Sequence, residues 1–103
     1  MATKAKAEKR TPAVDGIGFK VGQAVFIRSV TNYFTGRVVA VDGVFVKLEE
    51  AAWLAQTGRY FNYLQTGVPA EVEPYPDGMA VRVGIGGIID WCEWPHALPR
   101  SQK

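Results

Sequence analysis

The sequence has few of the residues from which most catalytic and metal sites are built. Its 103 residues include one cysteine, Cys92, and one histidine, His96. A single cysteine excludes a disulfide within the chain and favours a reducing compartment, so we expect a cytoplasmic location. Structural zinc sites use several Cys or His ligands at short spacing, so the sequence predicts no metal site and no cofactor.

Long hydrophobic runs are also missing. No stretch approaches the ~20 apolar residues that a membrane-spanning helix needs, and the first residues do not resemble a signal peptide. We therefore expect no membrane partner. Apolar residues make up 48% of the chain and charged residues 21%, as in ordinary folded domains, and 11 glycines and 6 prolines indicate many turns.

The body of the chain has a deficit of basic residues, because these are concentrated at the ends. Residues 1–12 carry four basic side chains against Glu8, and 100–103 carry two more. The stretch 15–99 holds six basic and nine acidic residues, a net charge of −3. A folded nucleic-acid-binding domain usually has a basic face, so such a partner is disfavoured. We expect 1–13 to be a flexible basic arm and 100–103 to be a solvated tail.

Alternating apolar and polar residues predict short β-strands. Five are expected, at about 24–30, 33–41, 44–48, 79–83 and 88–94, and 70–74 is expected to be a short extended piece. Asp42-Gly43 favours a two-residue hairpin turn between the second and third strands, with positive φ at both positions. Gly36, inside the second strand, predicts a bulge or a sharp bend.

One segment departs from this alternation. Residues 49–57 are rich in helix formers, with acidic residues in the first turn, where they suit the helix dipole. Residues 59–65 are expected to add a further helical turn or two before Gly67. We therefore predict a helical insertion at about 49–66 within a single domain spanning 14–99.

These elements predict a mainly β fold, a small and strongly bent five-stranded barrel with a short helical insertion. The stretch 22–48 resembles the first motif of Sm-like proteins, which has a glycine before an apolar strand, then a glycine six residues ahead of an aspartate. The residues that fit this motif are Gly22, Val25, Ile27, Gly36, Val38, Asp42 and Leu48. The stretch 79–94 resembles the second motif, and both stretches also suit an SH3-like barrel. The resemblance implies a barrel that can assemble edge to edge into a ring.

The RNA-contacting residues of Sm-like proteins are not carried over. Where those proteins have an asparagine after the aspartate, residues 44–46 are Val-Phe-Val. Where they have an arginine beside the second-motif glycine, this chain has Val83 and Ile85, and Arg82 is displaced. The resemblance therefore concerns the fold and assembly rather than an RNA site.

A second resemblance covers most of the chain. Ala-Trp-Leu-Ala-Gln-Thr-Gly-Arg-Tyr-Phe at 52–61 and Glu-Val-Glu-Pro-Tyr-Pro-Asp-Gly at 71–78 are similar to stretches of uncharacterised small proteins. Those proteins are carried by phages, plasmids and other mobile elements. The resemblance implies no particular activity.

Candidate catalytic groups are few. A cysteine nucleophile needs a base within hydrogen-bond reach, but Pro95 should turn the chain away before His96. Cys92 shares a predicted strand face with Trp94, which indicates a packed thiol. Gly-Ile-Gly-Gly at 84–87 precedes a strand rather than a helix, so it favours a tight hairpin over a phosphate-binding loop. We predict no catalytic residue and no enzymatic activity.

Carboxylates surround the predicted insertion. They are Glu49, Glu50, Glu71, Glu73 and Asp77. No apolar pocket is indicated that would separate two carboxyl pKa values for acid–base catalysis. A solvated acidic face is therefore expected, and it suits a basic protein segment, including the chain's own arm, better than DNA.

The chain has more aromatic side chains than a small barrel can enclose. Some should cover the end of the barrel and others should be exposed, and Trp, Tyr and Arg supply much of the energy of protein interfaces. The interface candidates are Trp53, Tyr60, Phe61, Tyr63, Trp91 and Trp94. We predict a non-enzymatic interaction or assembly module that forms a homo-oligomer and binds a protein partner.

Two alternatives stay open. One is a barrel that binds single-stranded nucleic acid through the basic arm and stacking aromatics. Its candidate residues are Lys4, Lys6, Lys9, Arg10, Tyr33, Phe34 and Arg37. The other is a small-ligand pocket between the insertion and the barrel, near His96.

Overall fold

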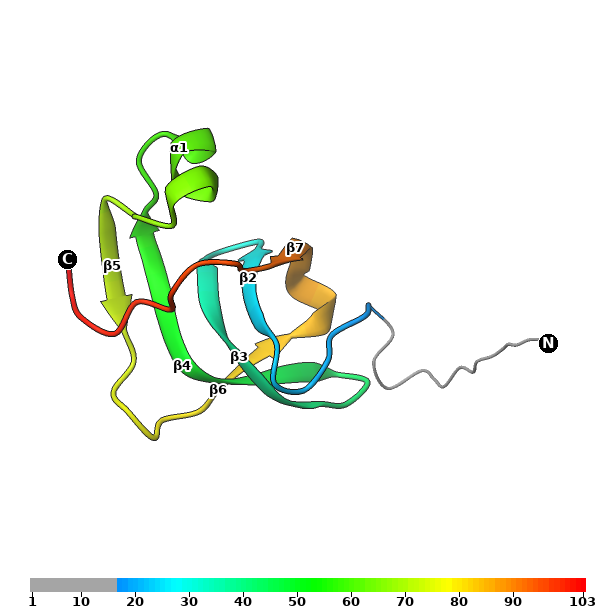
Figure 1. Ribbon diagram of the computed structural model, residues 1–103. Coiled ribbons are helices and arrows are strands. Elements are labelled where there is room, and N and C mark those ends of the chain that lie inside the picture. The colour runs from blue at the N-terminus through cyan, green and yellow to red at the C-terminus, as the bar shows by residue number, and fades with distance from the viewer. Residues whose placement is uncertain (1–16) are drawn as a thin grey trace.

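The computed structural model describes residues 17–103, and their fold is mainly β, as predicted (Figure 1). The six strands are β2 (Ala24–Ser29), β3 (Tyr33–Val41), β4 (Phe45–Gln56), β5 (Glu71–Pro74), β6 (Val81–Gly84) and β7 (Ile88–Glu93). The α-helix α1 spans Tyr60–Thr66, and the 3-10 turn η2 spans Ile85–Gly87. The basic arm predicted at 1–13 lies outside the described residues.

Strand β4 organises the sheet because it is long enough to take two partners along one edge. The strand order is β5-β4-β3-β2-β7, and β6 also pairs with β4; every pairing is antiparallel. The first part of β4 pairs with β6, and the part from Ala52 to Gln56 pairs with β5. The described sheet therefore has six strands rather than the expected five.

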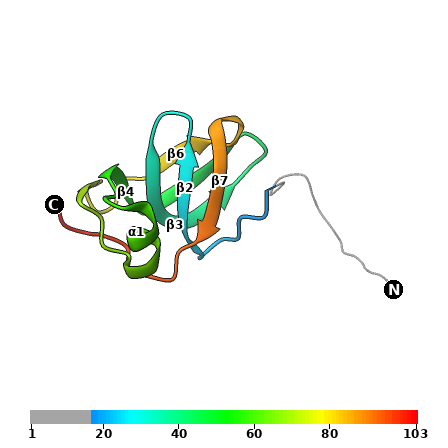
Figure 2. The same cartoon turned by 90° about the horizontal axis from the view of Figure 1, so that it is seen from above.

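The sheet is curled but not closed. The turn η2 leads from β6 into β7, and β7 pairs with β2 at the other end of the sheet. Seen from above, β4 and β6 lie behind β2, β3 and β7 (Figure 2). Among residues 17–103 no strand pairing joins β6 to β7. The tight hairpin expected at 84–87 is therefore wrong, because η2 carries the chain across the curl instead.

The hairpin between β3 and β4 forms where it was predicted, but with a different turn. The Asp42 carboxylate accepts hydrogen bonds from the N–H groups of Val44 (2.7 Å) and Phe45 (2.9 Å). These two bonds lower the pKa of Asp42. Gly43 does not have a positive φ, so the expected two-residue turn is wrong. The loop is organised by the aspartate side chain, which mimics a backbone turn.

A bulge bends β4 sharply at Glu50. There, Glu50 and Ala51 together face a single residue of β3, Gly36. Glu50 has a φ of 51°, in the left-handed region, which re-aims the strand. A Cβ on Gly36 would lie 3.0 Å from the Cβ of Leu48, so the close approach of the two strands requires glycine. The irregularity predicted within the second strand at Gly36 therefore lies opposite Gly36, on β4.

Only the second part of the helical insertion predicted at about 49–66 is helical, and the first part is a strand. Residues 49–56 continue β4, and only Tyr60–Thr66 is helical. Helix propensity is a weak preference, and here pairing with β3 and β5 together with burial of alternate side chains overrides it. The predicted stop at Gly67 is confirmed, since Gly67 caps α1 with a φ of 75°.

The curled sheet encloses an inner core. Its buried members are Phe19, Val25, Ile27, Val38, Val46, Leu48, Ala51 and Val83. Trp91 stacks on Phe19 with ring centroids 4.3 Å apart, and its indole N–H donates to the Ile17 carbonyl at 3.0 Å. Trp91 thereby fixes the segment that leads into β2.

The opposite face of the same strands carries an outer core. Its buried members are Phe26, Ala52, Leu54, Tyr63, Val72 and Trp94. Phe26 stands between two inner-core residues in the sequence, so β2 buries both of its faces. Tyr63 of α1 stacks on Trp94 at 4.8 Å and meets Phe26 edge to face at 5.3 Å. The helix and the segment after β7 thus cover this face.

The C-terminal segment is bonded to the sheet, which corrects the expectation of a solvated tail at 100–103. The backbone N–H groups of Val72 and Lys103 each donate to the other residue's carbonyl at 3.0 Å. The Arg100 guanidinium donates to three backbone carbonyls, at 3.2, 3.3 and 2.9 Å, and to Asp77 at 2.8 Å. The segment therefore adds one bridge to the outer edge of β5.

Replacing Gly36 with alanine should lower the free energy of unfolding by about 1–3 kcal/mol, because the new Cβ pushes on Leu48 at the bend. Gly84→Ala is the matched control, since Gly84 is a strand glycine without a positive φ and with nothing within 4 Å of its Cβ position. It should change stability by less than about 0.5 kcal/mol. Chemical denaturation measures both variants, and equal losses would contradict the bulge.

Arg100→Ala should lower the free energy of unfolding by about 1–2 kcal/mol, because three backbone carbonyls and a carboxylate each lose a donor. Arg59→Ala is the control, since Arg59 is also exposed and its side chain makes no hydrogen bond to the rest of residues 17–103. Denaturation midpoints test the pair. Identical midpoints would show that Arg100 does not anchor the C-terminal segment.

Candidate functional site

Three strands bring a row of side chains to one face of the sheet. Trp53 of β4 is paired with Phe34 of β3 on one side and with Glu73 of β5 on the other. Residues directly opposite in antiparallel strands point to the same face. Tyr75 lies two residues beyond Glu73 and continues this face, and its N–H donates to the Ala51 carbonyl at 2.8 Å. Phe34, Trp53, Glu73 and Tyr75 are called the Trp53 face below.

The Trp53 face is open, whereas the opposite face of the same strands is covered. On the covered side Leu54 pairs with Val72, and both are buried in the outer core with α1. Trp53 is 40% exposed, while Phe34 and Tyr75 are half-buried against the inner core. After the bend, the face of β4 that lines the inner core therefore continues past the curled part of the sheet and is exposed to solvent.

A hollow of about 250 Å³ lies on the Trp53 face. It is lined by Trp53, Glu73, Pro74, Tyr75 and Pro76. Ligand pockets usually have volumes of about 300–1,000 Å³ and enclose most of the ligand. This hollow is smaller, so it fits one side chain of a partner protein better than a free metabolite. It offers aromatic and proline surfaces beside one carboxylate.

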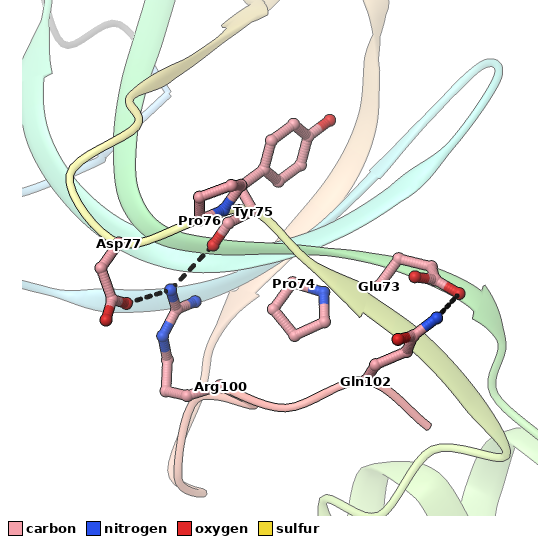
Figure 3. Close-up of a pocket in the computed structure, with 7 residues that line it drawn as sticks. All are labelled: Glu73, Pro74, Tyr75, Pro76, Asp77, Arg100 and Gln102. Atoms are coloured by element: carbon pink, nitrogen blue, oxygen red, sulfur yellow. Dashed lines mark hydrogen bonds and ion pairs between the residues drawn. The ribbon is translucent and has the colours of Figure 1, made fainter.

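A neighbouring hollow of about 340 Å³ lies where the C-terminal segment meets the Pro74–Pro76 stretch (Figure 3). Its polar groups already bond one another: Arg100 binds Asp77 (2.8 Å) and the Tyr75 carbonyl (2.9 Å), and Gln102 binds Glu73 (3.4 Å). Figure 3 shows the Tyr75 ring pointing away from Arg100. The residues that line this second hollow hold the C-terminal segment in place. The Tyr75 ring, in contrast, belongs to the Trp53 face.

A separate cluster joins β2, β7 and α1. The Arg28 guanidinium lies over the rings of Tyr33 (5.9 Å) and Tyr60 (5.7 Å). Arg28 also donates two hydrogen bonds to the Asp90 carboxylate, which lower the pKa of Asp90 and raise that of Arg28. Tyr60 remains 40% exposed and the adjacent Phe61 is 70% exposed. Tyr60 therefore helps to hold Arg28, while Phe61 presents its ring to solvent.

The structure divides the predicted interface aromatics into two groups. The exposed ones are Trp53, Tyr60 and Phe61. Tyr63 and Trp94 are core residues instead, with 2% and 6% of their surfaces exposed. Burial also raises the pKa of Tyr63. Trp91 is half-buried, and both its stacking and its indole hydrogen bond are used inside the fold.

The nucleic-acid candidates within residues 17–103 are not brought into one groove. Arg37 forms an ion pair with Glu50 at 3.2 Å, and Tyr33 belongs to the Arg28 cluster. Phe34 belongs to the Trp53 face, which also carries the Glu73 carboxylate. Residues 17–103 hold eight basic and eight acidic side chains. The remaining candidates, Lys4, Lys6, Lys9 and Arg10, lie outside the described residues.

His96 fastens α1 to the segment after β7. Its Nε2 donates to the Leu64 carbonyl at 2.8 Å, and its ring meets Trp94 edge to face at 4.8 Å. The backbone of Gly67 approaches so closely that a Cβ there would lie 2.5 Å from the His96 Cβ. The region near His96 predicted as an alternative ligand pocket is occupied by these contacts.

Cys92 is exposed, so the expectation of a packed thiol is wrong. A bulge at Ile89 in β7 changes the expected alternation and turns Ile88 toward the inner core. Partial burial and then the charge of Asp90 raise the pKa of Cys92. The thiolate is the nucleophilic form, so this environment does not activate the cysteine.

The described part of the chain is also without two other kinds of site. Between residues 17 and 103, no group of His, Cys, Asp and Glu side chains is arranged to hold a metal ion. No helix in the same stretch is both long and apolar enough to cross a membrane. The Trp53 face is therefore the surface that we take as the candidate functional site.

No protein family, curated protein or solved structure matches this chain. Over residues 17–103 the fold and the candidate site define a small, mainly β protein with one antiparallel sheet and one short helix.

Sequence reasoning missed the residues that complete the Trp53 face. It placed Glu73 in a solvated acidic patch and Tyr75 in a turn, because the helix expected at 49–57 separated Trp53 from both. The available signal was the two-residue spacing of Glu71, Glu73 and Tyr75, which places all three on one face of a strand. Pairing that strand with β4 aligns them with Trp53.

Cys92 should react with a soluble disulfide reagent more slowly than a cysteine in a short peptide, because its raised pKa leaves less thiolate at about pH 8. Asp90→Asn should lower the pKa and speed the reaction, since it removes a negative charge that disfavours the thiolate. Reaction rates measured across pH give both values. A Cys92 that matches or exceeds the peptide rate contradicts this account.

Proposed function

We propose that this protein is a non-enzymatic interaction and assembly module that self-associates and binds a protein partner. The observation that carries the proposal is the exposure of Trp53 (40%), Tyr60 (40%) and Phe61 (70%) in a chain that buries four other aromatic side chains. Exposed aromatic side chains are typical anchors of protein interfaces. Trp53 also lines a hollow that fits a single side chain.

Self-association is supported by the unfinished edges of the sheet. Within residues 17–103, β6 pairs only with β4, and β7 pairs only with β2. An unpaired edge is a template for another strand. Ile89 in β7 is 59% exposed, and Val30, which directly follows β2, is 73% exposed. The Val30 N–H donates to the Gly87 carbonyl, just before β7. Pairing of β6 in one copy with β7 in the next would build a ring.

We further propose that β2, β3, β4, β6 and β7 correspond to the strands of an open barrel of the Sm-like or SH3-like type, to which β5 and α1 are additions. The strand order and the short connection η2 support this. A role among phages, plasmids and other mobile elements rests on the resemblance of 52–61 and 71–78. A cytoplasmic location rests on the single cysteine.

The two alternatives receive no specific support from the described residues. For nucleic acid, Arg37 is paired with Glu50, and the described residues are balanced in charge. For a small ligand, the region beside His96 is filled by Leu64, Trp94 and Gly67. We therefore propose protein binding as the function.

Light scattering at the highest soluble concentration should give a mass that is a multiple of the 11.3 kDa chain. Ile89→Lys should shift the protein toward the monomer, because it places a charge at the start of the β7 edge. The control is Val44→Lys, which adds the same charge to a side chain that is 70% exposed in the loop between β3 and β4. A strict monomer for the unaltered chain would overturn self-association.

A further inference from the structure

We infer that the Trp53 face binds a lysine or arginine side chain presented by a segment of the partner protein. The inference rests on the proposed function and deepens it, because it names the chemistry that the partner must carry. The cation would sit between the Trp53 ring and the Glu73 carboxylate, above the hollow that both residues line.

The register of the strands places the two required groups side by side. Trp53 and Glu73 are directly opposite in β4 and β5, and the Tyr75 ring closes the hollow on the same face. A cation over the face of a tryptophan ring is attracted by the ring's electrons, and a carboxylate beside it adds a charge-assisted hydrogen bond. The hollow of about 250 Å³ has room for one long side chain.

Among residues 17–103 the charge of Glu73 is not compensated by an arginine, in contrast to that of three other carboxylates. Asp77 pairs with Arg100, Glu50 with Arg37, and Asp90 with Arg28. Glu73 accepts only a long hydrogen bond of 3.4 Å from the neutral amide of Gln102. Within residues 17–103 no basic side chain forms an ion pair with it.

Glu71 strengthens the negative character of this face. It lies two residues before Glu73 on β5, so its side chain points to the same side of the strand. Both glutamates are exposed, and neither is paired with a cation in the part of the chain that the structure describes. A phosphate backbone would be repelled here, and a purely apolar partner would bury Glu73 without a counter-charge.

The same molecule contains an occupied example of this chemistry. In the Arg28 cluster, a guanidinium lies over the rings of Tyr33 and Tyr60 and is bonded to the Asp90 carboxylate. The Trp53 face has the corresponding set, two aromatic rings and a carboxylate, without the cation. The partner's basic side chain would supply the missing member.

The test uses the full chain, isotope-labelled, and a short peptide of lysine, glycine and serine, with arginine and glutamine counterparts. The chain has three tryptophans. The Trp91 indole is bonded inside the fold and Trp94 is buried. The lysine or arginine peptide should therefore shift the indole NMR signal of Trp53 alone, and the glutamine peptide should shift none.

Substitutions at the site should weaken peptide binding while leaving the fold intact. Glu73→Gln and Trp53→Leu should each raise the Kd by about tenfold, which corresponds to the loss of one charge-assisted or cation–π contact. Glu93→Gln is the control, because it removes an exposed carboxylate from β7 and should leave the Kd unchanged. Unchanged Trp91 and Trp94 signals confirm that each variant is folded.

The outcomes separate this inference from the proposed function. Equal binding of the glutamine peptide, or an unchanged Kd in Glu73→Gln, overturns the inference and leaves the function standing if light scattering still shows an oligomer. A monomer that binds none of the peptides overturns both. Stronger peptide binding after deletion of residues 1–12 would overturn the assignment to a separate partner, because the chain's own basic arm would then be the competing occupant.

Discussion

The bend in β4 at Glu50 is the constraint on which the rest of the structure depends. Before the bend, β4 pairs with β6 and contributes to the inner core; after it, β4 pairs with β5 and carries α1 on its outer side. The bend exists because Gly36 lets the two strands approach and because Glu50 adopts a left-handed conformation. Without it, Trp53 and Glu73 would not stand side by side on an open face.

Ion pairs among the described residues link neighbouring elements of the fold. Three carboxylates are matched with arginines, and those pairs hold β2 to β7, β3 to β4, and the C-terminal segment to the turn after β5. Exposed pairs of this kind contribute little stability individually, so their main effect is to fix position. Glu73 stands apart because it lies beside exposed aromatic surface and has no such partner among residues 17–103. That contrast gives the Trp53 face its proposed role.

Sequence patterns predicted the strands well and the insertion poorly, for identifiable reasons. The strand at 33–41 and the stop at Gly67 follow from alternation and from glycine's conformational freedom, both of which are local. The extension of β4 to Gln56 depends on a partner strand about 20 residues later in the chain, which no local pattern reports. Bulges such as the one at Ile89 change which residues share a face, so the burial of Cys92 was also mispredicted.

The most direct test of this account is the pattern of nuclear Overhauser contacts across the second half of β4. A bent, continuous strand predicts cross-strand contacts from Trp53 to Glu73 and to Phe34, and from Leu54 to Val72. A helical pattern of contacts between residues three apart over 49–56, without the cross-strand set, would contradict it. In that case the Trp53 face would not exist as described.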